Sequence, residues 1–226
     1  MRALLLAGGY GKRLRPLTNT IPKCLIKVKE VTLLESWYQK LKKNNIDDIY
    51  CNSHYLHQTV ADFISKKKLI MNNLYEKKLL GTGGTMIRNL EKFIDQELIV
   101  IHCDNYTKDD LKSFIKLHES RPKNCLVTIF SFITDYPEQC GIIQENNNIV
   151  TNIFEKVKGV NGNLANGAIY LFSKDALKFI NENLPKAKDI ILDILPHFFN
   201  KIYLYKTNKR FTDIGTHENL YKANLF

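Results

Sequence analysis

The sequence predicts an α/β fold with a mixed, mostly parallel sheet that helices cover on both faces. Three observations support this prediction: short apolar runs alternate with segments of helical periodicity, turn residues separate them, and the first run ends in glycines. The chain has 226 residues and is 44% hydrophobic, which is enough for one domain of this class. We therefore expect a single domain over residues 1–226.

Strand–helix units that suit a parallel sheet fill the first half of the chain. The apolar run Arg2–Ala7 predicts a buried first strand, because it is short and glycines follow it at once. In the segment 33–43, Leu34, Trp37 and Leu41 fall on one helical face and predict an amphipathic helix. The other expected elements of this half are a strand at 48–53, a helix at 58–67, a helix at 85–93, a strand at 98–102, a helix at 108–118 and a strand at 125–132.

The second half contains a hairpin pattern. The triplet Asn146-Asn147-Asn148 separates two alternating runs at 141–145 and 149–156, which predicts a β-hairpin. The other expected elements are a strand at 168–172, helices at 174–183 and 189–198, a strand at 202–205 and a helix at 216–223. We expect one continuous sheet with two halves, about 1–120 and 121–226, whose ligands lie beyond the carboxyl ends of the strands.

Charge and composition narrow the class of protein. The 33 Lys and Arg against 23 Asp and Glu give a net charge of +10, which favours anionic partners such as phosphorylated small molecules or nucleic acid. The dense basic runs 66–68 and 77–78 are more typical of solvated surface than of a nucleic-acid stripe. The five cysteines form no C-x-x-C pair, which disfavours a zinc ribbon or a disulfide framework. No apolar run approaches the roughly 18 residues that span a bilayer, and no secretory signal begins the chain, so we expect a cytoplasmic protein.

A glycine-rich loop at Gly8-Gly9-Tyr10-Gly11 follows the first strand directly. Glycines let the backbone turn tightly and bring N–H groups close to an anion, and Lys12 and Arg13 add cationic donors. Leu14 stands where a dinucleotide fingerprint needs glycine, and Arg13 stands where a P-loop needs Ser or Thr. The loop is therefore either a plain tight turn or a phosphate site of another kind.

Two further segments contain candidate ligand groups. The small residues Gly81-Thr82-Gly83 precede an expected helix, so they either let a flat base lie against the backbone or provide Thr82 as a helix cap. Asp104 closes the most apolar strand. A carboxylate there is suited to hold Mg²⁺ for phosphoryl transfer, or it caps the following helix.

Together these segments resemble the sugar-1-phosphate nucleotidylyltransferase family. Residues 6–18 read L-A-G-G-Y-G-K-R-L-R-P-L-T and residues 22–28 read P-K-C-L-I-K-V, close to the family's L-A-G-G-x-G-x-R-L-x-P-L-T and P-K-x-L-I-x-V. Further similar segments are L-G-T-G-G at 80–84, H-C-D at 102–104, F-E-K at 154–156, N-G-A-I-Y at 166–170 and F-T-D-I-G-T at 211–216. The resemblance implies the Rossmann-like nucleotide-diphospho-sugar transferase fold. It also implies an enzyme that forms an NDP-sugar and pyrophosphate from an NTP and a sugar 1-phosphate.

The resemblance also implies roles for single residues. Arg13 and Lys23 are the expected catalytic cations, and Asp104 and Asp213 are the expected ligands of Mg²⁺. The expected nucleotide-binding residues are Leu6, Ala7, Gly8, Gly9, Gly11, Asn52, Gly81, Thr82 and Gly83. The expected sugar-phosphate-binding residues are Glu155, Lys156, Asn166 and Gly167. This chain has Cys24 where the family commonly has proline, and Cys103 where it commonly has glycine.

The L-G-T-G-G segment is similar to the guanylyl branch, and the glutamine of the thymidylyl enzymes is missing, so GTP is the expected nucleotide. By length and by this segment, the chain looks most like the D-glycero-α-D-manno-heptose 1-phosphate guanylyltransferases, which supply capsule or surface polysaccharide biosynthesis. Mannose 1-phosphate guanylyltransferases and N-acetylmuramate 1-phosphate uridylyltransferases are the alternatives.

Two hypotheses from other classes stay open. One is a regulatory relative that binds nucleotide sugar without catalysis, which the presence of Lys23, Asp104 and Asp213 disfavours. The other is a nucleic-acid-binding protein, which would explain the charge of +10. Because the motifs extend to residue 216 of 226, we expect no C-terminal β-helix, and an exposed sheet edge would allow a homodimer.

Overall fold

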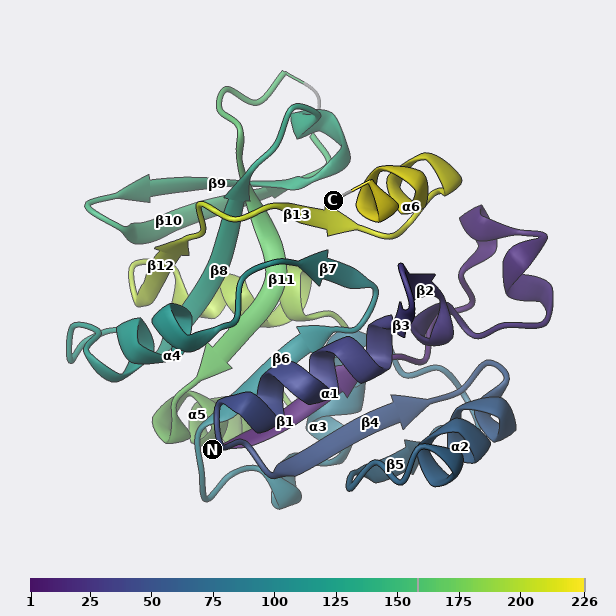
Figure 1. Ribbon diagram of the computed structural model, residues 1–226. Helices are drawn as coiled ribbons and strands as arrows, with labels where there is room; N and C mark the ends of the chain where they lie inside the picture. Colours follow the sequence, from purple (N-terminus) through teal and green to yellow (C-terminus); the bar gives the residue numbers. More distant parts are fainter. Residues whose placement is uncertain (158, 226) are drawn as a thin grey trace.

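A nine-stranded mixed sheet forms the centre of the computed structural model, which describes residues 1–157 and 159–225 (Figure 1). The first half of the sheet contains β1 (Arg2–Leu6), β4 (Asp48–Ser53), β5 (Asn72–Tyr75) and β6 (Leu98–His102). These four strands are parallel and lie in the order β5-β4-β1-β6. Their carboxyl ends therefore meet at one edge.

The second half of the sheet is joined to the first by antiparallel pairing. It contains β8 (Val127–Ile133), β9 (Gly141–Asn146), β10 (Ile149–Glu155), β11 (Leu164–Phe172) and β12 (Ile202–Lys206). The order continues β6-β11-β8-β12-β10-β9, with β11 antiparallel to both β6 and β8 and with β12 parallel to β8. The predicted α/β class with a mixed sheet is confirmed.

Helices cover both faces of this sheet (Figure 1). They are α1 (Leu33–Lys43), α2 (His57–Lys66), α3 (Thr82–Arg88), α4 (Lys112–Glu119), α5 (Lys174–Asn183) and α6 (His217–Asn224). No helix in the described part of the chain has the length and apolar character to cross a membrane.

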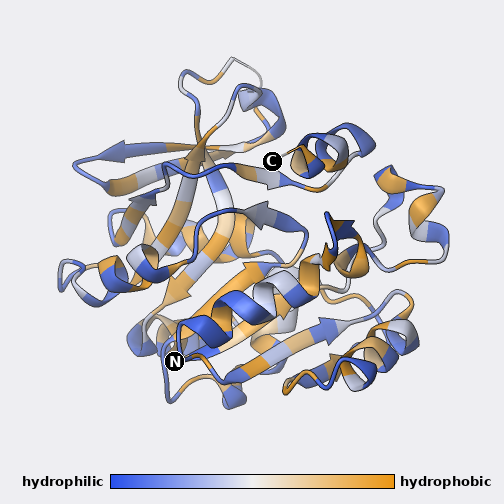
Figure 2. Ribbon diagram, in the orientation of Figure 1, coloured by the Kyte–Doolittle hydropathy of each residue, from blue (hydrophilic) through white to orange (hydrophobic). Residues whose placement is uncertain are grey.

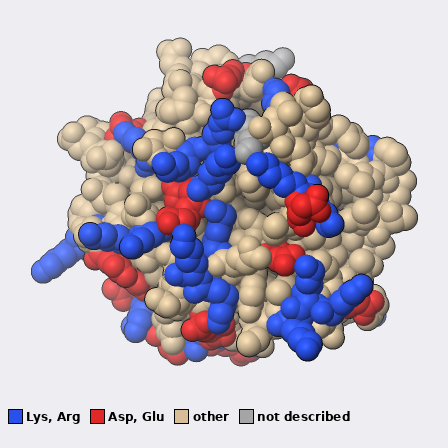
Figure 3. All heavy atoms as spheres, viewed as in Figure 1, with Lys and Arg blue, Asp and Glu red and all other residues tan. Residues whose placement is uncertain are grey.

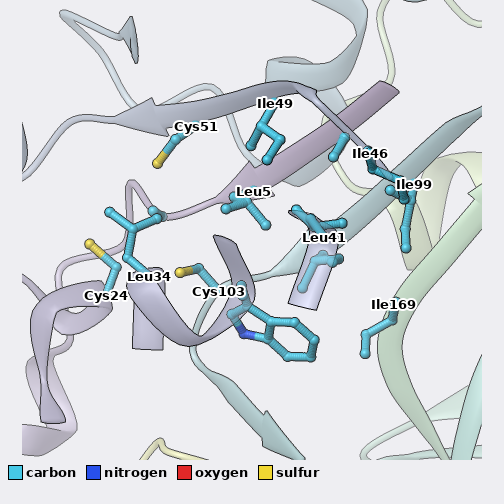
Figure 4. Close-up of a cluster of buried hydrophobic side chains, with 14 of the residues drawn as sticks. Leu5, Cys24, Leu34, Leu41, Ile46, Ile49, Cys51, Ile99, Cys103 and Ile169 are labelled. Atoms are coloured by element: carbon cyan, nitrogen blue, oxygen red, sulfur yellow. The ribbon is translucent and has the colours of Figure 1, made fainter. Parts of the chain in front are cut away.

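Alternate residues of β1 belong to different hydrophobic clusters. Leu5 packs in one with Leu34 of α1, whereas Leu4 packs in another with Met86 of α3. Figure 4 shows Leu5, Leu34, Leu41 and Ile99 in the first of these clusters. The apolar residues gather in the central strands, as the hydropathy colouring shows (Figure 2). Burial on both faces explains why these strands are continuous apolar runs.

Several predicted elements are confirmed at their boundaries, including the helices at 33–43 and 174–183 and the strand at 48–53. The predicted hairpin is also confirmed, and both residues of its turn, Asn147 and Asn148, have positive φ values of 51° and 62°. The predicted start of helix α4 was wrong. The helix begins at Lys112 and not at 108, because the backbone at Leu111 is left-handed, with φ 68°, and cannot belong to a right-handed helix. Residues just before this segment form a short strand, β7 (Asn105–Thr107).

Two other predicted helices differ from the structure. The helix expected at 85–93 starts at Thr82, since Gly81 with φ 83° lets the chain turn directly into it, and it ends at Arg88. In the segment expected as a helix at 189–198, a five-residue π-helix (Ile190–Ile194) is followed by a 3-10 helix (Leu195–Phe198). Pro196 lacks the N–H that would continue a regular helix there.

The prediction also missed several short strands. Besides β5 and β7, these are β2 (Lys27–Val28), β3 (Val31–Thr32) and β13 (Phe211–Asp213). The pairs β2–β3 and β7–β13 form two separate two-stranded sheets. Strands of two or three residues have too few positions for an alternating pattern to be visible in the sequence.

Candidate active site

Two adjoining pockets lie at the carboxyl ends of the parallel strands, and both include His102 and Asp104 in their linings. Of the residues expected to bind nucleotide, seven line the first pocket: Leu6, Ala7, Gly8, Gly9, Asn52, Gly81 and Thr82. Of the residues expected to hold sugar phosphate, three line the second pocket: Glu155, Lys156 and Asn166. Lys23 lines the first pocket, and Arg13 and Asp213 line the second.

The remaining predicted residues do not line these pockets. Gly11 has φ 63° and packs against Thr18 and Lys23, so it shapes the loop behind Lys23. Gly83 packs against the backbone at Lys188 and Asp189, and its N–H donates to the Lys188 carbonyl oxygen at 2.9 Å. The carbonyl oxygen of Gly167 accepts from Asn105 Nδ2 at 2.8 Å.

Asp104 and Asp213 are brought together by the pairing of β7 with β13. Asp213 pairs with Asn105, and the Ile214 N–H donates to the Asp104 carbonyl oxygen at 2.9 Å. The ammonium group of Lys23 is bonded to Asp104 Oδ2 and lies 3.6 Å from Asp213 Oδ1. Two carboxylates 109 positions apart therefore share one cationic group, with the Arg13 guanidinium 3.7 Å from Asp213 Oδ2.

The two carboxyl groups differ in their electrostatics. Burial and the neighbouring Asp104 raise the pKa of Asp213 above its ordinary value, although Lys23 opposes this. Burial acts in the same direction on Asp104, but Lys23 overcomes it and holds the pKa of Asp104 below its ordinary value. The pair therefore needs cationic charge close by in order to be fully ionised.

The same two carboxylates fit a magnesium ion. Asp213 Oδ1 is buried and has no hydrogen-bond partner in the described part of the chain, so it is available to a cation. Residues 1–157 and 159–225 contain no cluster of three or more His, Cys, Asp or Glu that would enclose a metal by itself. Mg²⁺ is usually bound by one or two carboxylates together with substrate phosphates. The carboxylates of Asp104 and Asp213 are a donor set of this kind.

The Asn52 side chain accepts hydrogen bonds from two backbone N–H groups at the start of the loop 8–11. Its Oδ1 atom accepts from the N–H of Ala7 at 2.6 Å and from that of Gly8 at 3.2 Å. The N–H groups of Ala7 and Gly8 are therefore already hydrogen-bonded within the protein. A side chain at Gly9 would meet no atom within 4 Å, so the open part of the loop begins there.

The segment 80–84, which we call the 80–84 loop and whose last three residues begin α3, is docked on the segment 187–190. A Cβ atom at Gly81 would lie 2.4 Å from the Lys188 carbonyl oxygen, so a larger residue cannot stand there. Gly83 and Gly84 both donate their N–H to that oxygen. Thr82 does not cap α3. Its hydroxyl donates to Asp189 Oδ2 at 3.2 Å and accepts from the Ile190 N–H at 2.9 Å.

In the second pocket, all three of the expected polar side chains have partners within the chain. The Lys156 ammonium lies 3.0 Å from Glu155 Oε1. The Asn166 carboxamide donates to the Tyr170 hydroxyl and accepts from the Ala168 N–H, both at 2.9 Å. These contacts leave Glu155 and Lys156 as the more accessible pair for a ligand.

Three further residues at the pockets were not predicted as site residues. His102 lines both pockets, and burial lowers its pKa. Asp189 lines the second pocket, and Glu76 lies buried behind the first. The sequence offered no signal for Asp189 and Glu76, because each is a single acid in a polar segment whose partners are distant or irregularly spaced.

Basic side chains contribute to both pockets, but the basic residues of the surface do not form one stripe. On the face shown in Figure 3, Lys and Arg side chains are spread over several elements and alternate with acidic ones. This distribution suits a compact polyanion better than an extended nucleic acid.

Comparison with known proteins shows what the chain is similar to. The nucleotidyl transferase family model matches residues 2–226. A D-glycero-α-D-manno-heptose 1-phosphate guanylyltransferase from Campylobacter jejuni is 31% identical over 202 residues, which cover 83% of this chain and 88% of that protein. The chain matches two other relatives over only part of their length. It spans 62% of a provisionally assigned mannose-1-phosphate guanyltransferase from Sulfolobus acidocaldarius and 61% of mannose-1-phosphate guanylyltransferase 1 from Arabidopsis thaliana.

Solved structures share the fold over the whole chain. HddC from Yersinia pseudotuberculosis complexed with GMP-PN has a TM-score of 0.81, is 25% identical, and is matched over 99% of this chain and 98% of that one. A Bacillus anthracis protein provisionally assigned as a glucose-1-phosphate thymidylyltransferase has a TM-score of 0.89 at 25% identity, covering 100% of this chain and 94% of that one.

Proposed function

This chain belongs to the nucleotidyl transferase family, and we propose that it transfers a nucleotidyl group from an NTP to a sugar 1-phosphate and releases pyrophosphate. The observation that carries the proposal is the convergence of Lys23, Asp104 and Asp213 where the two pockets adjoin. One pocket is then the site of the NTP and the other the site of the sugar 1-phosphate.

The proposed reaction is an in-line displacement at the α-phosphorus of the NTP. An oxygen of the sugar phosphate forms the new P–O bond, and the bond from the α-phosphorus to the α–β bridging oxygen breaks, so that this oxygen leaves with the pyrophosphate. The attacking phosphate is already ionised at neutral pH, so no general base is needed. The catalytic difficulty is to hold two polyanions together and to stabilise the added charge.

The proposed roles of the side chains follow from their charge and position. Arg13 and Lys23 stabilise the charge that develops on the leaving pyrophosphate, and Lys156 positions the attacking phosphate. Asp104 and Asp213 would hold Mg²⁺, which supplies positive charge to the phosphates when bound. Because Lys23 now lies between these carboxylates, its ammonium group must shift toward the phosphates as they bind.

The 80–84 loop supports a base that carries a carbonyl oxygen. The N–H of Leu80 donates to Glu76 Oε2, and those of Gly83 and Gly84 donate to Lys188. Gly81 and Thr82 are left as the N–H donors of this loop that can face a base, and donors suit the oxo groups of guanine or of a pyrimidine. Guanine is our choice because of the heptose guanylyltransferase relative and the HddC complex with GMP-PN.

For the sugar, we propose D-glycero-α-D-manno-heptose 1-phosphate, which the Campylobacter jejuni relative supports. Mannose 1-phosphate is the second candidate, because mannose-1-phosphate guanylyltransferases also match the chain.

The test is pyrophosphate release with each of the four NTPs combined with heptose, mannose, glucose and N-acetylmuramate 1-phosphates in the presence of Mg²⁺. We expect release with GTP and a manno-configured sugar 1-phosphate. Pyrophosphate release with another NTP and not with GTP would overturn the guanine assignment. Binding without release for every pair would favour a regulatory relative.

A further inference from the structure

Glu76 is a buried carboxylate to which the mechanism above gives no role. It directly follows β5 and is only 4% exposed. None of the ion pairs formed among residues 1–157 and 159–225 includes it. Burial of a carboxylate without a cation is costly unless hydrogen bonds satisfy its oxygens, so its contacts indicate what it does.

Three donors satisfy the Glu76 carboxylate. Its Oε1 atom accepts from the Thr85 hydroxyl at 2.5 Å and from Asn52 Nδ2 at 3.2 Å. Its Oε2 atom accepts from the Leu80 N–H at 3.3 Å. Thr85 lies in α3 and Leu80 begins the 80–84 loop, so one carboxylate ties the end of β4 to both ends of that loop.

The bond to Asn52 also determines which way the Asn52 carboxamide faces. A carboxamide has one donor end and one acceptor end. Because Glu76 takes the donor end, Asn52 Oδ1 is directed at the N–H groups of Ala7 and Gly8. An ideal Cβ atom at Gly8 would lie 2.9 Å from Asn52 Nδ2, so the backbone could not approach Asn52 this closely if a side chain stood at position 8.

We propose that Glu76 is a positioning residue for the nucleotide, because it holds the start of the loop 8–11 and the 80–84 loop at a fixed spacing. Asn52 and Thr85 line the first pocket, whereas Glu76 acts from behind them. None of these three is among the described residues that line the second pocket. The inference rests on the proposed function in one respect, namely that the first pocket takes an NTP.

A reciprocal exchange of the two side chains provides a sharp test. With Asn52→Asp alone, two acids would face each other. With Glu76→Gln alone, an amide N–H would face either the Asn52 donor or the Leu80 N–H. In the double variant, the new amide donates to the new carboxylate and accepts from Leu80, while the carboxylate keeps the bonds from Ala7 and Gly8. The net charge is restored and every donor again has an acceptor, although the bond between positions 52 and 76 runs in the reverse direction. The Thr85 hydroxyl, which donates to Glu76 and accepts from Asn52 in the wild type, exchanges these roles and donates to the new carboxylate.

The experiment measures the dissociation constant of a non-hydrolysable GTP analogue by calorimetry and the KM values of both substrates. We expect each single variant to bind the analogue at least tenfold more weakly than the wild type, and the double variant to bind within about threefold of it. The KM of the sugar 1-phosphate is expected to stay within about twofold throughout, which a general loss of structure would not allow. Glu91→Gln, at an exposed acid, serves as the matched control.

Single variants that bind like the wild type would overturn the inference, as would a double variant no better than the single ones or one that does not fold. If a single variant does not fold, recovery of folding and binding in the double variant still supports it. Because binding of the analogue is measured without turnover, these outcomes stay distinct from the failure of the proposed reaction, which would appear as absent pyrophosphate release by the wild type.

Discussion

The hydroxyl group of Thr82 donates to Asp189 Oδ2 at 3.2 Å, although the two residues are 107 positions apart. Thr82 lines the first pocket and Asp189 lines the second. The same hydroxyl accepts from the Ile190 N–H at 2.9 Å, and Asp189 Oδ1 accepts from the N–H groups that begin the π-helix. One threonine thus connects the wall of the nucleotide site to the wall of the sugar site.

Replacement of Thr82 by valine is expected to affect both substrates. Valine keeps the shape of threonine but loses both hydrogen bonds and leaves the Ile190 N–H unpaired, which costs about 1–2 kcal/mol of stability. Because about 1–2 kcal/mol corresponds to roughly 5- to 30-fold in an equilibrium constant, we expect the KM values for NTP and for sugar 1-phosphate to rise together by up to roughly 30-fold. Steady-state kinetics of Thr82→Val and of the hydroxyl-retaining control Thr82→Ser check this. A change confined to one substrate would contradict the connection.

Lys23→Ala is expected to lower kcat by roughly 10²–10³-fold while the fold stays intact, because it removes a fixed charge from the transition state. The readouts are pyrophosphate release and the circular dichroism spectrum. Lys27→Ala is the control, since Lys27 is an exposed lysine four positions away whose partner is Glu30. A folded Lys23→Ala enzyme with turnover near that of the control would remove Lys23 from the mechanism.

Asp104→Asn is expected to raise the Mg²⁺ concentration that gives half-maximal rate by at least about tenfold. The variant keeps the size of the side chain but removes one of the two negative charges that attract the ion. A Mg²⁺ titration at saturating substrates measures the effect, with Asp62→Asn on the exposed face of α2 as control. An unchanged titration midpoint would rule out the metal role of Asp104.

The regular elements were predictable from the sequence because their patterns are local. The helix at 33–43 presents Leu34, Trp37 and Leu41 at helical spacing, and Thr32 accepts from the Glu35 N–H as its cap. The strand β7 was not predictable, because its three residues acquire their conformation from β13, which lies a hundred positions later. Tertiary pairing of this kind leaves no periodic signal in either segment.

In the candidate site, too, some features were predictable from the sequence and others were not. The pocket residues Lys23, Asp104 and Asp213 were found through motifs, and the structure brings them together. The roles of Asn52 and Thr82 were expected to be contacts with the nucleotide, yet their polar atoms bond to other parts of the chain. Motifs identify which residues matter. Which partner a polar group takes depends on segments that meet only in the folded chain.

The stability of the protein in acid is expected to depend on Glu97, which precedes β6. The His118 ring, whose Nε2 atom lies 3.3 Å from Glu97 Oε1, and the charge of Arg121, whose guanidinium lies 3.2 Å away, lower the pKa of Glu97 from 4.5 to about 2. A lowered pKa means that the folded state favours the ionised form. The stabilisation is complete above the unfolded-state pKa near 4.5 and is lost as the pH falls toward 2.

Glu97→Gln therefore lowers the free energy of unfolding at pH 7 but has little effect at pH 2.5. The side chain is 30% exposed, so after allowance for solvent screening we expect the difference to be about 1–3 kcal/mol. Urea unfolding of the wild type and the variant at both pH values measures it, with Glu182→Gln on the exposed side of α5 as control. If the wild type and Glu97→Gln lose equal stability between pH 7 and pH 2.5, Glu97 has an ordinary pKa in the folded protein and its contacts with His118 and Arg121 do not stabilise the ionised form.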